Sequence, residues 1–190
     1  DQTLLVGTGL ESTNATVSLT QKVAEAGADA ALVLTPSFYQ PTDVGLLRHF
    51  ETIADQVDIP ILLYNVPKYT GRNIPVALAI ELAQHPNIIG MKDSAGNLGQ
   101  LVELHQRLPE EFSLLLGSDT VFYGGFAHGV RGAVLALSNV APAECVALAR
   151  AVEDDDWQEA QSLADRLAPV GRTVVGKFGV PGLKLSLIHI

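Results

Sequence analysis

The sequence predicts an α/β fold, namely six βα units of an incomplete (β/α)8 TIM barrel followed by C-terminal helices. Short apolar runs alternate with longer amphipathic stretches, and Gly, Pro, Asn or Asp residues stand at the joints, which is the pattern of repeated βα units. The runs are apolar throughout, as parallel strands covered on both faces are. Polar residues come at or just after the ends of these runs, where barrels build their active sites. They are Thr8, Thr35, Tyr64, Lys92, Ser118 and Ser138.

Six apolar runs are expected to form strands, at residues 3–8, 30–35, 60–64, 87–92, 112–116 and 132–137. The helices between them start at residues that favour helix N-termini, which are Ser12, Thr42, Pro75 and Asn97. We expect these helices to end near residues 26, 57, 84 and 108. After the last strand, residues 142–153 and 155–175 are expected to form two helices without a strand between them.

An open doubly wound sheet is the alternative to a barrel. No Gly-x-Gly-x-x-Gly fingerprint follows the first strand, because Gly7-Thr8-Gly9 is too short for one. Six strands cannot close an eight-stranded barrel, so we expect two further βα units before Asp1. The expected organisation is a partial barrel over residues 1–140, a helical extension over 141–184 and a non-native or frayed tail over 185–190.

Composition narrows the function classes. The chain has 190 residues, 47% of them hydrophobic, and lacks an apolar run long enough to cross a bilayer, so we expect one soluble, well-cored domain and no membrane partner. A net charge of −9 without a basic cluster argues against a nucleic-acid partner. The lone Cys145 allows neither an internal disulfide nor a cysteine-based zinc site. A reducing, cytoplasmic location is therefore expected, or a mitochondrial one in a eukaryote.

Lys92 stands at the end of an apolar run that is otherwise typical of a buried strand. An apolar environment disfavours the charged form of an amine, and a neutral amine can attack a ketone to form a Schiff base. Tyr64 ends the preceding strand, 28 positions earlier, and opens a turn. If the two strands are neighbours, a phenol lies beside the amine and can pass protons to and from a bound substrate.

The motifs around these two residues resemble those of a known enzyme family. Tyr64-Asn65-Val66-Pro67 is followed at the family's interval by Gly90-Met91-Lys92-Asp93-Ser94-Ala95-Gly96-Asn97. Together they resemble the dihydrodipicolinate synthase/N-acetylneuraminate lyase family of class I aldolases. The resemblance covers nearly the whole chain and places its strands as the third to eighth of the barrel.

The resemblance implies a site and a reaction class. Lys92 would form the Schiff base with pyruvate or another 2-oxo acid, and Tyr64 would be the proton shuttle. The positions implied for substrate binding are Thr8, Ser94, Gly117, Ser118 and Val134. The iminium withdraws electrons from the bond being broken, which is the task of the divalent ion in metal-dependent aldolases. We therefore expect neither a metal nor a cofactor.

The chain departs from the family pattern in three places. The Gly-x-x-Gly-Glu segment that holds the substrate carboxylate is absent, so residues 1–190 alone are expected to be inactive. The family's second tyrosine, lent across a dimer interface to the proton relay, matches Phe38, and we assign that role to the adjacent Tyr39. Tyr69 stands where lysine-pathway synthases carry an arginine.

A homodimer or homotetramer is expected for the full-length protein.

Two segments favour one branch of the family. The segment from Gly176 to Lys184 and the Met91-Lys92-Asp93-Ser94 motif resemble the 4-hydroxy-2-oxoglutarate aldolase branch, which predicts cleavage to pyruvate and glyoxylate. The first alternative is 4-hydroxy-tetrahydrodipicolinate synthase, which joins pyruvate to aspartate semialdehyde. The second is a barrel that binds 2-oxo acids without catalysis, against which the presence of both Lys92 and Tyr64 argues.

Overall fold

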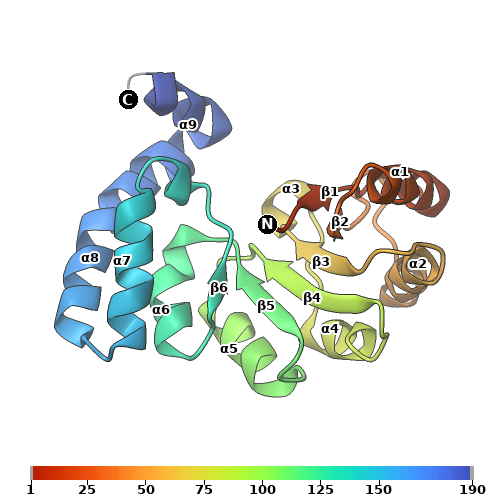
Figure 1. Cartoon of the computed structure of the whole chain (residues 1–190), viewed down its shortest axis with the longest axis horizontal. Coiled ribbons are helices and arrows are strands. Elements are labelled where there is room, and N and C mark those ends of the chain that lie inside the picture. The colour runs from red at the N-terminus through yellow and green to blue at the C-terminus, as the bar shows by residue number, and fades with distance from the viewer. Residues whose placement is uncertain (1, 189–190) are drawn as a thin grey trace. The chain divides into compact units, whose positions relative to one another are not determined.

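The structure is a computed structural model that describes residues 2–188 (Figure 1). The chain forms two compact units. The first comprises Asp1–Ala95 and Glu103–Leu114, and the second comprises Gly96–Val102 and Leu115–Ile190. The division expected near residue 140 stays a prediction.

The first unit is built from parallel strands and the helices that connect them. Its elements are β1 (Leu5–Gly7), α1 (Thr13–Glu25), β2 (Ala30–Leu34), α2 (Asp43–Asp55), β3 (Ile61–Asn65), α3 (Pro67–Thr70), α4 (Val76–Leu82) and β4 (Ile88–Asp93). β1 pairs with β2, β2 with β3 and β3 with β4, all in parallel. Helix α1 packs against α2, and α2 against α4 (Figure 1).

Apolar side chains from strands and helices form the core of this unit. On α2, Leu46, Phe50 and Ile53 are fully buried, and on β3 Ile61 and Leu63 are fully buried as well. Their spacing on α2 follows the helical period, which gives the helix one continuous apolar stripe against the sheet. The buried side chains of α2 and β3 therefore pack the strands against the helices, and this packing fixes the positions of the strand ends.

Two elements lie on the border between the units. α5 (Leu98–Arg107) begins in the second unit and ends in the first, and β5 (Ser113–Leu116) begins in the first and ends in the second. The six strands follow one another in the sheet in sequence order, from β1 to β6. A doubly wound sheet would reverse its order at a switch point, so the sequential order supports the expected part of a barrel.

The second unit contains one short strand and a set of helices. Its elements are a 3₁₀ turn (Asp119–Val121), α6 (Phe122–Ala127), β6 (Gly132–Ala133), a second 3₁₀ turn (Leu137–Asn139), α7 (Pro142–Glu153), α8 (Trp157–Val170), a π-helix (Gly171–Lys177) and α9 (Gly179–Ile188). β5 pairs with β6 in parallel. Helices α7 and α8 lie side by side (Figure 1).

The helix starts predicted from capping residues are confirmed. The side chains of Ser12 and Thr42 accept hydrogen bonds from the amides of Ala15 and Gly45, at 3.1 and 3.2 Å. Asn97 likewise precedes α5 and accepts from the Gln100 amide. These bonds satisfy backbone donors that the first turn of a helix leaves without an internal partner.

Two expected boundaries were wrong. The last strand ends at Ala133 rather than at residue 137, because the chain turns there and the Ser138 hydroxyl donates to the Leu135 carbonyl at 2.7 Å. The helix expected over residues 155–175 starts at Trp157 after the Asp156 cap and gives way to the π-helix at Gly171. Residues 185–188 are part of α9, and the non-native or frayed tail expected over 185–190 stays a prediction. Residues 189–190 of that tail lie outside the described residues.

Candidate active site

Tyr64 and Lys92 lie side by side at the C-terminal ends of neighbouring strands. They are register partners in the β3–β4 pair, so their side chains leave the sheet on the same face. The Lys92 Nζ atom lies over the Tyr64 ring, 4.4 Å from its centroid. Both side chains are half-buried. The sequence made the contact between the amine and the phenol conditional on the two strands being neighbours, and the structure shows that they are.

A buried hydrogen-bond network lies one residue further along both strands. The side-chain amide of Asn65 donates to Asp93 Oδ1 at 2.7 Å and to Asn73 Oδ1 at 2.8 Å, and its carbonyl accepts from the Ile74 amide at 3.0 Å. Asn65 is fully buried and Asp93 is 2% exposed. Sequence reasoning did not single out this network, although an Asn and an Asp ending adjacent apolar strands could have indicated it.

Three hydroxyl groups come from strand ends of the same unit. Ser94 follows Lys92 by two positions, and its Oγ atom is buried without a hydrogen-bond partner, as is Thr35 Oγ1 at the end of β2. Thr8 is different, because its Oγ1 atom lies 2.8 Å from that of Thr20 on α1. The structure therefore engages Thr8 in the contact between strand and helix, and gives its predicted substrate contact no support.

Tyr39 lies on an exposed loop that Glu11 holds. The Glu11 carboxylate accepts from the Ser37 hydroxyl at 2.6 Å, the Ser37 amide at 3.0 Å and the Phe38 amide at 2.9 Å. These bonds, that of the Ser37 hydroxyl first, lower the pKa of Glu11. Phe38 and Tyr39 are 76% and 82% exposed and meet edge to face. Tyr39 is thus turned to solvent in this chain, and its role in a proton relay stays a prediction.

Tyr69 lies on the short helix that follows Tyr64. It is 67% exposed, and the Lys68 amine lies 5.6 Å from its ring centroid. Arg72 at the end of the same turn forms an ion pair with Asp43 of α2. Lys68 is therefore the cation beside the position that Tyr69 occupies, whereas Arg72 is engaged with its own carboxylate.

The predicted substrate contacts Gly117, Ser118 and Val134 belong to the second unit. Ser118 Oγ lies 2.8 Å from Thr120 Oγ1. Val134 is exposed, and its amide donates to the Leu116 carbonyl at 2.9 Å. Their placement against Lys92 stays a prediction.

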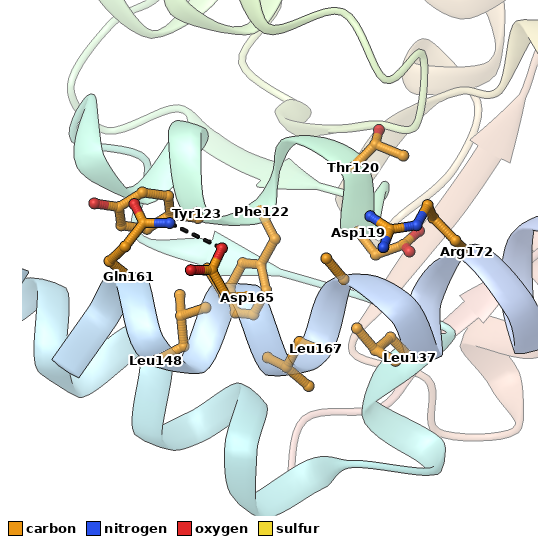
Figure 2. A pocket seen from close by; sticks show the side chains of 12 residues that line it. Asp119, Thr120, Phe122, Tyr123, Leu137, Leu148, Gln161, Asp165, Leu167 and Arg172 are labelled. Atoms are coloured by element: carbon orange, nitrogen blue, oxygen red, sulfur yellow. Dashed lines mark hydrogen bonds between the residues drawn. The ribbon is translucent and has the colours of Figure 1, made fainter. Parts of the chain in front are cut away.

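The second unit also holds a cavity of about 340 Å³ that the sequence did not predict (Figure 2). Arg172 of the π-helix lies beside Asp119 at one end, and Gln161 donates to Asp165 at 3.0 Å at the other. The remaining wall is Thr120, Phe122, Tyr123, Leu137, Leu148, Ala164, Leu167 and Ala168. No sequence motif marks it, because its wall comes from separate helices that meet only after folding.

Two groups of side chains bear on other chemistries. Within residues 2–188, no three or more His, Cys, Asp or Glu side chains are arranged to hold a metal ion. Burial, and then Glu144 and Asp119, raise the pKa of the buried Cys145 thiol, which disfavours the thiolate form that nucleophilic cysteines use. No helix in the described part of the chain has the length and apolar character of a membrane span.

Comparison with known proteins decides the family. Residues 2–189 match the dihydrodipicolinate synthetase family. The chain belongs to this family. The family resemblance drawn from the motifs around Tyr64 and Lys92 is thereby confirmed.

Family members with known names and structures are similar along most of the chain. The 4-hydroxy-tetrahydrodipicolinate synthase of Exiguobacterium sibiricum is 41% identical over 167 residues, which are 88% of the chain and 57% of the relative. That of Bartonella bacilliformis is 38% identical over 188 residues, 98% of the chain and 64% of the relative. The chain thus spans about three fifths of the length of these relatives.

Solved structures of the family share the fold. The crystal structure of dihydrodipicolinate synthase from Aquifex aeolicus superposes with a TM-score of 0.92 at 34% identity, over 98% of this chain and 64% of that one. The synthase from Acinetobacter baumannii, complexed with pyruvate, gives a TM-score of 0.92 at 30% identity over the same shares. The six parallel strands and C-terminal helices are therefore those of a family member.

The names of these relatives bear on the predicted branch. They are 4-hydroxy-tetrahydrodipicolinate synthases, which is the alternative that the sequence left open. The expected branch, 4-hydroxy-2-oxoglutarate aldolase, is not supported by them. Similarity in the segment from Gly176 to Lys184 and around Lys92 was too local to choose between the two branches.

Proposed function

We propose that the protein to which this chain belongs is a Schiff-base-forming lyase that condenses pyruvate with aspartate semialdehyde, the reaction of a 4-hydroxy-tetrahydrodipicolinate synthase. The observation that carries the proposal is the Lys92 amine held 4.4 Å from the centroid of the Tyr64 ring at the ends of two parallel strands. The names of the relatives and the pyruvate complex of a family structure support it.

Lys92 would supply the covalent step. Its neutral amine attacks C2 of pyruvate, water leaves and an iminium forms. Loss of a proton from C3 gives an enamine, whose C3 then attacks the aldehyde carbon of the second substrate. The new alkoxide takes up a proton, and the amino group of the semialdehyde attacks C2 of the re-formed iminium. The bond between C2 and Lys92 Nζ then breaks, Nζ takes up the proton that the attacking nitrogen loses, and the cyclic product leaves with the Lys92 amine restored. The iminium nitrogen is the electron sink when C3 loses its proton.

Tyr64 would move the protons of these steps. Water has to leave when the iminium forms, and the alkoxide has to be protonated, so a hydroxyl beside the nitrogen serves both. The contact between the Tyr64 ring and the Lys92 amine, 4.4 Å from Nζ to the ring centroid, supports this role. Tyr39 would join the relay only in an oligomer, from the exposed loop that Glu11 holds.

The second substrate has to be held by its carboxylate. An arginine would grip it as a bidentate pair, but the matching position is Tyr69. Lys68 lies against the Tyr69 ring and supplies a positive charge there, while Arg72 is paired with Asp43. We infer that Lys68 takes over the attraction of the semialdehyde carboxylate.

Trapping the imine tests the covalent step. Two proteins are incubated with pyruvate and borohydride: the chain alone, and the chain joined to the part of the Aquifex aeolicus synthase that it does not cover. The masses of their peptides are then measured by mass spectrometry. We expect a reduced pyruvyl adduct on Lys92 of the joined protein and none on Lys22, an exposed lysine of α1. A folded joined protein with no adduct on Lys92, or with equal adducts on both, would contradict the mechanism.

Turnover measurements separate the reactions. We expect the joined protein to condense pyruvate with aspartate semialdehyde at a higher kcat/KM than it cleaves 4-hydroxy-2-oxoglutarate. The reverse order would favour the aldolase. Pyruvate binding without an imine or turnover of either substrate would favour a non-catalytic barrel.

A further inference from the structure

We propose that Asn65 and Asp93 are a positioning pair that sets the geometry between Tyr64 and Lys92, and that proton transfer depends on it more than imine formation does. The inference rests on the proposed function for its kinetic consequences, and on the hydrogen-bond network for its structural ones. Neither residue is assigned to contact substrate.

The two side chains tie the strand ends together beyond the sheet ladder. Asn65 Nδ2 donates to Asp93 Oδ1 at 2.7 Å, and the Ser94 amide donates to the Asn65 carbonyl at 2.8 Å. Asp93 Oδ1 also accepts from the Ala95 amide at 3.1 Å. The end of β3 is therefore bonded to the last residue of β4 and to the residue after it.

Asn65 also fixes the segment that leaves β3. Its side-chain carbonyl accepts from the Ile74 amide, and its amide donates to Asn73. The chain between Asn65 and Asn73 contains the α3 turn. A fully buried amide with three partners on two segments has one orientation that satisfies them all, because each buried bond that is lost leaves a polar group unpaired.

Side-chain alternation places this pair next to the site but not in it. Successive side chains of a strand point to opposite faces. Tyr64 and Lys92 share one face, so their immediate neighbours Asn65 and Asp93, which are also register partners, share the other. The pair can act on the reaction only through the backbone that carries Tyr64 and Lys92.

The strand pair needs such a lock because its register is irregular. Ile61 pairs with Ile88, but Leu62 pairs with Gly90, so Ile89 has no partner. A one-residue slip in a sheet moves side chains to the opposite face. The hydrogen bond between Asn65 and Asp93, at the C-terminal ends of both strands, holds the shifted register as far as Tyr64 and Lys92.

Proton transfer is the step that a loosened register should affect. Covalent attack needs the Lys92 amine to reach the substrate, and a small shift of Tyr64 leaves that intact. A proton relay requires hydrogen-bond contact, and a misplacement of about 1 Å can cost about 100-fold in rate. Turnover should therefore fall while the extent of imine trapping stays the same.

Three substitutions test the pair in the joined protein described above. We expect Asn65→Ala and Asp93→Ala to lower kcat by about 10- to 100-fold, with borohydride trapping on Lys92 retained and KM for pyruvate little changed. Asp93→Asn keeps an oxygen that can accept from Asn65 and Ala95, so it should retain most of the activity. Equal losses for Asp93→Asn and Asp93→Ala would show that the charge acts instead, and would overturn the positioning role.

Asn87→Ala is the matched control for stability. Asn87 precedes β4 at its other end, and its amide donates to the carbonyls of Ala54, Val57 and Ile59 at 2.9 to 3.2 Å. This variant also removes a well-bonded Asn beside the same strand, so it should lower the urea midpoint as Asn65→Ala does. If both lower kcat alike, Asn65 is merely structural and the inference fails.

A measurement without turnover separates this inference from the proposed function. The Lys92 Nζ atom lies over the Tyr64 ring, so the ring should shift the NMR signals of the adjacent ε-methylene protons, and Tyr64→Leu identifies that shift. We expect Asn65→Ala to reduce the shift and Asn87→Ala to retain it. If wild-type Lys92 forms no imine, the proposed function fails and this signal still decides the positioning role. An unchanged shift in Asn65→Ala would overturn it.

Discussion

His49 Nδ1 and Thr13 Oγ1 lie 2.8 Å apart and join helices α1 and α2. His49 is 6% exposed, and its Nε2 atom is buried without a partner. Burial lowers the pKa of His49 to about 4, because a charged ring would lose its hydration there. The folded protein thus holds this imidazole neutral.

Stability should consequently fall as the pH falls from 6.5 to about 4. In this window the unfolded chain protonates His49 and the folded chain does not, which favours unfolding. Between pH 7 and 5 the expected loss is about 2 kcal/mol in the free energy of unfolding. Urea unfolding at both pH values measures it. His49→Gln should remove that part of the pH dependence, and His105→Gln, an exposed control on α5, should leave it. An equal pH dependence in all three proteins would refute the assignment.

The Glu11 contacts predict an acid-sensitive loop. Because the pKa of Glu11 is lowered, its bonds to the loop are fully present at pH values above the usual pKa of a glutamate. They weaken as the pH falls through the lowered pKa. Glu11→Gln should speed hydrogen exchange at the Ser37 and Phe38 amides at neutral pH, whereas Glu25→Gln on α1 should not. Unchanged exchange in Glu11→Gln would show that other contacts hold the loop.

Gly90→Ala should destabilise the first unit. A Cβ there would lie 2.6 Å from the Ser113 carbonyl oxygen and 2.9 Å from its Cβ atom, and backbone cannot swing away as a side chain can. We expect a loss of about 1–3 kcal/mol, the usual cost of overpacking. Gly7→Ala is the control, since nothing lies within 4 Å of the added atom. Urea unfolding of the two variants should separate them, and similar midpoints would contradict the packing described around Gly90.

Tyr64→Phe tests the proton shuttle in the joined protein. The substitution keeps the ring against Lys92 and removes only the hydroxyl. We expect turnover to fall by about 10²–10⁴-fold, the usual contribution of a general acid–base group, while borohydride still traps pyruvate on Lys92. Steady-state kinetics and peptide mass analysis measure the two effects. Wild-type turnover in this variant would exclude Tyr64 from proton transfer.

Local signals predicted much of this fold. Ser12, Thr42 and Asn97 begin helices because their side-chain oxygens bond to amides of the first turn, an interaction within three residues that the sequence displays directly. Helix α6 was missed, since Gly124 and Gly125 weaken its pattern and only packing makes it helical. In Gly125 a Cβ would lie 2.8 Å from Leu101, a contact with a residue distant in the sequence.

The two residues proposed for catalysis could be predicted from the sequence, but the network beside them could not. Lys92 and Tyr64 could be paired from the expectation that consecutive parallel strands neighbour each other. Asn65 and Asp93 were not found, because their bond depends on the shifted register of β3 and β4. The sequence also does not show in which direction a hydroxyl group points. It therefore did not predict that the Thr8 hydroxyl bonds to Thr20 of α1.

The unpaired Ile89 makes segment length matter more than side-chain identity between Ile88 and Lys92. Ile88 and Ile61 are partners, and four residues later in the chain Lys92 meets Tyr64, which is only three residues beyond Ile61. Deleting Ile89 would leave three residues on each strand, and a regular ladder would still set Lys92 opposite Tyr64. Inserting a residue would demand a second unpaired position or would turn the amine to the opposite face. Deletions in this segment should therefore be tolerated in evolution more often than insertions.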